Sequence, residues 1–251
     1  MKIRSAQMAV FEANARRNFE QEMYEHVREF SPELARAAGD KNVVTVIAMA
    51  IDRAERYGLT NRGPVRLYLE MMLTFGSNFD TDPALAWAGR TLSDQLTDQK
   101  TRAERLHSLA QDYLARVAGP NDELTVAALR RVRSVSPESF EAATGPFDER
   151  MLRLLRTVYP EKCAFVGQAA LDALFLEGKS ISTDLGLTKE IAKALVIGTM
   201  FAFGHGVTSD PLYPWVGETL RDERIEGPNT RANRLYRKFT LYVDHMIDCL
   251  R

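Results

Sequence analysis

Apolar side chains recur at spacings of three and four residues along most of this 251-residue chain. Such spacing places them on one face of an α-helix, whereas a half-buried strand would alternate apolar and polar residues. The segment 8–30 shows the helical pattern, with apolar side chains at Val10, Phe11, Ala15, Phe19, Met23, Val27 and Phe30. No convincing alternating run appears in the sequence. The pattern therefore predicts an all-α fold.

Two further segments, 64–76 and 190–204, are apolar on nearly all sides and should form the most buried helix of each half of the chain. Each follows a Gly-Leu-Thr sequence and ends in Phe-Gly. A glycine just past a helix can close it in the left-handed conformation. Thr60 and Thr188 are then candidates to cap the helix that follows each of them.

The chain repeats itself with an offset of 128 residues. The stretches "FGSNFDTDPALAW" (75–87) and "FGHGVTSDPLYPW" (203–215) align without a gap. About a quarter of the aligned positions between 23–92 and 151–220 are identical. A period of this length does not match a short solenoid repeat. It indicates two duplicated helical halves.

This duplication sets the expected domain organisation. After one inserted residue, "TRAERL" (101–106) matches "TRANRL" (230–235), so the similarity extends to the last helical segment of each half. We predict two tandem pseudo-symmetric helical repeats packed together. The first repeat covers 1–118, a connecting helical segment covers 119–150, and the second repeat covers 151–251.

The residues shared by the two aligned loops favour a structural role. The glycine after each Phe would close the buried helix, and each Asp would cap the next short helix with Pro at its first position. The tryptophan four residues later would face the body of the protein. The residues assigned this structural role are Phe75, Gly76, Asp82, Pro83, Trp87, Phe203, Gly204, Asp210, Pro211 and Trp215.

The two copies differ at positions where a partner could distinguish them. The second copy has a histidine between two glycines where the first has Ser-Asn, and an arginine is replaced by a glutamate inside the shared W-x-G-x-T-L frame. We expect these positions to lie on an exposed surface and to contribute to one asymmetric complex with a protein partner. The candidate partner-binding residues are His205, Gly206, Glu218 and Arg90.

Catalysis at the histidine is an alternative. His205 with the nearby Asp210 could act as an acid–base pair, but no nucleophile is clearly presented. The remaining histidines, His26, His107 and His245, show no HxxxH or HExxH spacing. Phosphate-loop, dinucleotide and GxSxG motifs do not occur. We therefore assign no catalytic residue and no metal ligand, and we expect no cofactor.

Composition narrows the possible partners and cellular compartments of the protein. The formal net charge is −1 and the pI is about 6.5, which provides no strong field to attract nucleic acid. The two cysteines occupy unrelated positions of the repeat, which is typical of a reducing compartment. The start of the chain lacks the apolar core of a signal peptide, and no apolar run is long enough to span a bilayer. We expect a cytoplasmic protein that does not enter a membrane. The sequence makes no prediction of the oligomeric state.

The stretch 53–92 resembles helical accessory proteins encoded beside bacterial type VI secretion effectors and their spike-tip proteins. The similarity rests on Tyr57-Gly58-Leu59, on 69–72 (Leu-Glu-Met-Met), and on Phe79-Asp80 followed by Asp82-Pro83-Ala84 and Trp87. The resemblance implies a non-catalytic role in effector loading, as a chaperone, co-chaperone or adaptor that binds the effector or its loading adaptor. An immunity protein that neutralises a cognate toxin, or a helical enzyme that uses His205, are the alternatives.

Overall fold

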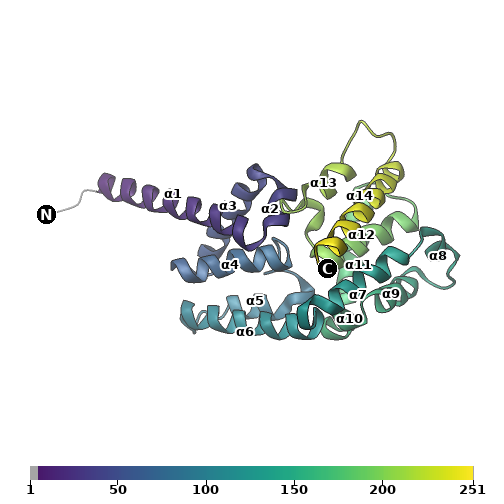
Figure 1. The fold of residues 1–251 in the computed structure, drawn as a ribbon, viewed down its shortest axis with the longest axis horizontal. Helices are drawn as coiled ribbons and strands as arrows, with labels where there is room; N and C mark the ends of the chain where they lie inside the picture. Colours follow the sequence, from purple (N-terminus) through teal and green to yellow (C-terminus); the bar gives the residue numbers. More distant parts are fainter. Residues whose placement is uncertain (1–4, 251) are drawn as a thin grey trace.

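The structure, a computed structural model that describes residues 5–250, consists of α-helices and short 3₁₀ turns, with no strand among those residues (Figure 1). The all-α prediction is confirmed. The first repeat contains α1 (Ser5–Phe30), α2 (Pro32–Ala38), α3 (Asp40–Arg56), α4 (Arg62–Phe75), η1 (Pro83–Leu85), α5 (Ala86–Leu92) and α6 (Gln99–Val117). The connecting segment contains η2 (Pro120–Asp122), α7 (Glu123–Ser134) and α8 (Pro137–Ala142). The second repeat contains α9 (Phe147–Val158), α10 (Pro160–Val166), α11 (Gln168–Asp184), α12 (Glu190–Phe203), η3 (Val207–Ser209), α13 (Pro214–Leu220) and α14 (Pro228–Cys249).

The helix boundaries repeat with the same offset as the sequence. The helices α2, α3, α4 and α5 begin and end 128 residues before α10, α11, α12 and α13. Shared residues explain the boundaries, because a proline opens α2 and α10 and a glycine separates each from the next helix. These glycines, Gly39 and Gly167, have φ values of +82° and +79°. Other side chains rarely adopt such values, so the helix stops there.

The first helix of the chain is the main departure from the repeat. α9 begins at Phe147, which corresponds to Phe19 in the middle of α1. Burial in α1 also begins at Phe19, and the described side chains before it are exposed. The second half of α1 therefore packs on the body as α9 does, whereas the first half projects away from it (Figure 1).

One continuous hydrophobic core runs through both repeats. The helices α4 and α12 carry the largest sets of buried side chains, as the sequence predicted. The core side chains of the two halves are in contact, so the repeats form one body and bury each other's apolar faces. Within residues 5–250, no helix is both long enough and apolar enough to cross a membrane.

The connecting segment covers the second repeat. α7 packs along α14, where a smaller cluster joins Phe239 and Val243 to Leu129 and Val132 (Figure 1). α8 packs on α12 and buries Phe140. The first turn of α9 lies before residue 151, inside the segment predicted as connecting.

The prediction that Thr60 and Thr188 cap α4 and α12 is wrong. The N-cap positions belong to Asn61 and Lys189, and neither uses its side chain as a cap. In the first repeat the backbone N–H groups of Thr60 and Asn61 both donate to Gln99 Oε1, at 2.8 and 2.9 Å. The start of α4 is therefore stabilised by a side chain of α6, which is distant in sequence.

Candidate functional site

The two Phe-Gly loops meet each other between the repeats. Gly76 and Gly204 follow α4 and α12 with φ values of +93° and +101°. A Cβ on Gly76 would lie 2.5 Å from the backbone oxygen of Phe203, and a Cβ on Gly204 would lie 2.8 Å from that of Phe75. Because the opposing atoms belong to the backbone, only glycine permits this close approach. Each loop therefore packs closely against the equivalent loop of the other repeat.

The aspartates shared by the two copies form hydrogen bonds from one loop to the other. Asp82 Oδ2 accepts from the backbone N–H of His205 at 3.0 Å, and Asp210 Oδ2 accepts from that of Ser77 at 2.7 Å. Both acceptors and both donors are 128 residues apart, so the contact is reciprocal. The Ser77 hydroxyl adds a second bond to Asp210, at 2.5 Å. Burial raises the pKa of Asp210, although these hydrogen bonds favour its charged form.

The capping prediction holds for one aspartate and fails for the other. Asp82 caps η1 by accepting from Ala84 N at 2.8 Å, with Pro83 at the first position of the turn. Asp210 accepts in the same way from Leu212 N at 2.9 Å. No helix begins at Pro211, however, because α13 starts only at Pro214. The local turn is shared, but the short helix follows it in the first copy only.

The expectation that His205 lies on an exposed loop is wrong. Its side chain is 14 % exposed and bridges the two repeats. Nδ1 lies 3.0 Å from Glu177 Oε1 on α11, and Nε2 lies 3.1 Å from Thr81 Oγ1 in the opposite loop. A hydroxyl, an imidazole and a carboxylate in this order resemble a nucleophile with its base and orienting acid. The Thr81 hydroxyl, however, also donates to Asn78 O at 3.2 Å. That directs its proton away from the ring, so the arrangement suits a bridge better than an activated nucleophile.

The other candidate partner-binding residues occupy two different environments. Gly206 faces the equivalent residue of the first copy, Asn78, whose side-chain nitrogen lies 1.8 Å from where a Cβ on Gly206 would be. Gly206 thus completes the contact between the loops. Arg90 on α5 and Glu218 on α13 are exposed, so both are accessible to a partner.

An aromatic triad supports each loop. In the first repeat Phe75 meets Trp87 and Tyr113 edge-on, with ring centroids 5.9 and 5.2 Å apart. In the second repeat Phe203 meets Trp215 and Tyr242 edge-on, at 6.3 and 5.2 Å. The tryptophans therefore pack against the body, as predicted. Tyr113 and Tyr242 were not singled out from the sequence, although they are 129 residues apart, the offset of the last helices.

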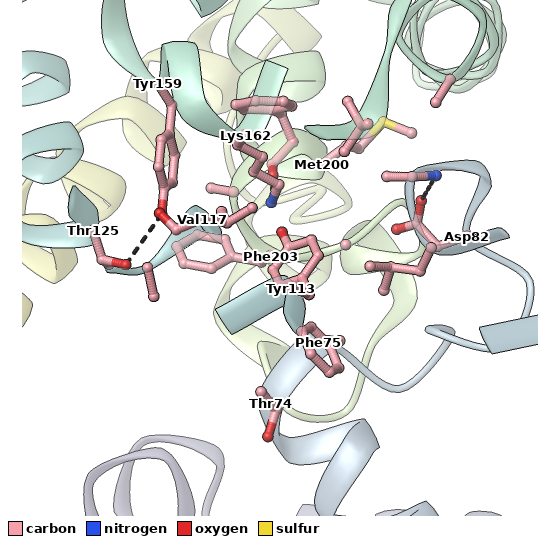
Figure 2. Close-up of a pocket in the computed structure, with 18 of the residues that line it drawn as sticks. Thr74, Phe75, Asp82, Tyr113, Val117, Thr125, Tyr159, Lys162, Met200 and Phe203 are labelled. Carbon is pink, nitrogen blue, oxygen red and sulfur yellow. Dashed lines mark hydrogen bonds between the residues drawn. The ribbon is translucent and has the colours of Figure 1, made fainter. Parts of the chain in front are cut away.

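A cavity of about 290 Å³ lies between α6 of the first repeat and α10, α11 and α12 of the second (Figure 2). Its walls are mostly aromatic and aliphatic and include Tyr113, Phe203 and Phe75. Tyr159 donates to Val117 O at 2.9 Å at its edge. The cavity is concave and mostly apolar.

The Lys162 side chain inside this cavity already has binding partners within the protein. The ammonium of Lys162 donates to the backbone oxygen of Phe201 at 2.5 Å and lies 4.8 Å from the centre of its ring. Burial lowers the pKa of Lys162, and the charge of Asp82 acts in the opposite direction. A desolvated lysine can act as a nucleophile. Here its hydrogen bond and ring contact join α10 to α12, which gives it a structural role.

Two exposed features lie outside these loops. The projecting half of α1 carries Met8, Val10 and Phe11, which are 50, 59 and 63 % exposed. Among the described residues, one group of side chains has the composition and spacing to hold a metal ion, namely Glu33 on α2 with His245 and Cys249 on α14. The sequence search for pairs of histidines missed this group, since its α14 pair is His-x-x-x-Cys.

No family model, no curated protein and no solved structure matches the chain.

Proposed function

We propose that the protein is a non-catalytic accessory protein of the cytoplasm that binds one protein partner through the projecting half of α1. In keeping with the resemblance, the partner is a type VI secretion effector or the adaptor that loads it. The observation that carries the proposal is that the apolar stripe of α1 continues beyond the body of the protein. The stripe that is buried at Phe19 and Met23 extends to Phe11 and Met8, which are exposed.

The length and direction of α1 suit insertion into a partner. The part of α1 before the ion pair of Arg16 with Asp52 of α3, residues 5–15, is about 16 Å long, enough to present several side chains on one face. An amphipathic helix that lays its apolar face in a groove is a common recognition mode. Burying side chains of this size contributes about 1.5–3 kcal/mol each, so two or three of them can dominate an interface.

The projection is confined to the first repeat. In the second repeat, α9 lacks the corresponding half-helix, and the preceding residues fold back as α8. Phe140 of α8 packs edge-on against Phe147, the equivalent of Phe19, with centroids 5.9 Å apart. The exposed apolar residues of the projecting half of α1 therefore have no counterpart on α9. This asymmetry supports a single partner on one side of the molecule.

Site-specific photo-crosslinking in the native host tests the proposal. A photoreactive residue at position 11 should capture one protein, and the same residue at position 241 should not, because Leu241 is 69 % exposed but lies on α14. Phe11→Glu should abolish capture and effector export, with an unchanged circular dichroism spectrum. Leu241→Glu is the matched control. Equal capture from both positions, or normal export by Phe11→Glu, would show that α1 is not the binding element.

The same experiment separates the alternatives. An immunity protein would be captured with the catalytic domain of a toxin, and Phe11→Glu would lose protection from that toxin. Arg90→Glu and Glu218→Arg, in the same assay, show whether the exposed positions of α5 and α13 form a second contact. Hydrolysis of a substrate by the purified protein, lost in His205→Ala, would instead establish an enzyme.

A further inference from the structure

The geometry points to a zinc site formed by Glu33, His245 and Cys249 that clips α2 of the first repeat to α14 of the second. A carboxylate, an imidazole and a thiol are ligands that Zn²⁺ accepts together. Their donor atoms all lie within 4.8 Å of one another. His245 and Cys249 are four residues apart on α14 and so share one face of the helix.

Two of the three distances between the donor atoms match a tetrahedral ion. Zinc bonds of about 2.3 Å to sulfur and about 2.0 Å to nitrogen, at the tetrahedral angle, place the two ligands about 3.5 Å apart. The observed separation of Cys249 Sγ from His245 Nε2 is 3.6 Å. Nitrogen and oxygen ligands should be about 3.3 Å apart. His245 Nε2 lies 3.4 Å from Glu33 Oε2. The structure thus already has two edges of the tetrahedron.

The contact between α10 and α6, which is equivalent to that between α2 and α14, is held together in a different way. α10, the counterpart of α2, packs against α6 through Phe165. The Phe165 ring lies 4.9 Å from that of Tyr113, and the Arg116 guanidinium lies 4.8 Å from its centre. In the α2–α14 junction the position of Phe165 is taken by Ala37, and that of Arg116 by His245. The aromatic packing is absent there, and metal ligands stand in its place.

Binding requires a thiolate and a free carboxylate oxygen. The Cys249 thiol gives up its proton to solvent as the zinc–sulfur bond forms, so no oxidant or reductant is involved. Arg36 forms an ion pair with the same Glu33 oxygen that faces His245. Arg36 therefore competes with the metal, and solvent fills the fourth position because His245 and Cys249 are exposed.

Metal titration of the reduced full-length protein tests the site. Co²⁺ should produce a thiolate-to-metal charge-transfer band at one equivalent, and Zn²⁺ should displace it. Cys249→Ser should abolish the band, whereas Cys163→Ser should keep it, because Cys163 is buried away from the ligands. His245→Ala and Glu33→Gln should each weaken Zn²⁺ binding at least tenfold. Arg36→Gln should tighten it.

Stability and mass measurements test the clip. Zn²⁺ should raise the melting temperature of the wild type and of His107→Ala, a control at an exposed histidine of α6, but not that of Cys249→Ser. Hydrogen exchange should slow in α2 and α14 together. A band that survives Cys249→Ser would overturn the site. Zinc binding without stabilisation, or only in a dimer that shares the ion, would overturn the clip within one chain.

Discussion

The close approach of the two Phe-Gly loops can be tested with a series of glycine-to-alanine substitutions. Gly204 has φ +101° and ψ +151°, and Gly167 has φ +79° and ψ +168°. These backbone values are almost restricted to glycine, so alanine should cost about 1–3 kcal/mol at either position. The two positions differ in their surroundings. A Cβ at Gly167 meets nothing within 4 Å, whereas one at Gly204 meets the Phe75 oxygen at 2.8 Å.

The steric contact should add a further cost of about 1–3 kcal/mol, as for other overpacked sites. We therefore expect Gly204→Ala to lower the free energy of unfolding by about 2–6 kcal/mol, and Gly167→Ala by about 1–3 kcal/mol. Gly76→Ala and Gly39→Ala form the same pair in the first repeat. Alanine also reduces the freedom of the unfolded chain, but this effect is alike at all four positions and cancels in the comparison.

Urea unfolding followed by tryptophan fluorescence and circular dichroism provides the measurement. Trp87 and Trp215 lie in the triads beside the loops, so fluorescence reports on the junction itself. Gly198→Ala, inside α12 with nothing within 4 Å of the new Cβ, is the control for an open position with ordinary helix geometry. It should stabilise the protein by about 0.5–1 kcal/mol. If Gly204→Ala costs no more than Gly167→Ala, the loops do not meet as described.

Three further substitutions test the contacts between and within the repeats. Because burial raises the pKa of Asp210, the folded state holds the proton of its carboxyl group more tightly than the unfolded state does. The contribution of Asp210 to stability therefore falls as pH rises from about 4 through the raised pKa. Asp210→Asn should remove that part of the pH dependence of urea unfolding, and an unchanged pH profile would contradict the assignment. His205→Ala should cost about 1–2 kcal/mol in the same measurement, because it removes the bridge to Glu177 and Thr81; a loss near zero would indicate an exposed loop. Arg150→Glu alone should cost about 3–5 kcal/mol, because the buried Arg150 loses its pair with Glu190 and its contacts with Phe140, and a second carboxylate is placed beside Glu190. The double substitution Arg150→Glu/Glu190→Arg should recover the part that comes from the charge pair, since the equivalent pair in the first repeat, Glu22–Arg62, has the charges in that order. Additive losses in this double-mutant cycle would refute the pairing.

The sequence by itself determined the helices and many of their ends. Periodic apolar residues give each helix a face to bury, and the local signals at Pro32, Pro160, Gly39 and Gly167 start or stop a helix. These effects act within a few residues, and a duplication copies them together. The all-α fold and the structural role of Gly76 and Gly204 could therefore be predicted from the pattern.

Only the tertiary structure decided which groups meet. Asp82 was expected to cap its own turn, and it does, but its second oxygen bonds the backbone of His205 in the other repeat. His205 was expected on the surface, and its bridge to Glu177 depends on how α11 packs. Glu33 and Cys249 lie near opposite ends of the chain. Such contacts depend on the packing of distant helices, which periodicity, capping and motif spacing do not encode.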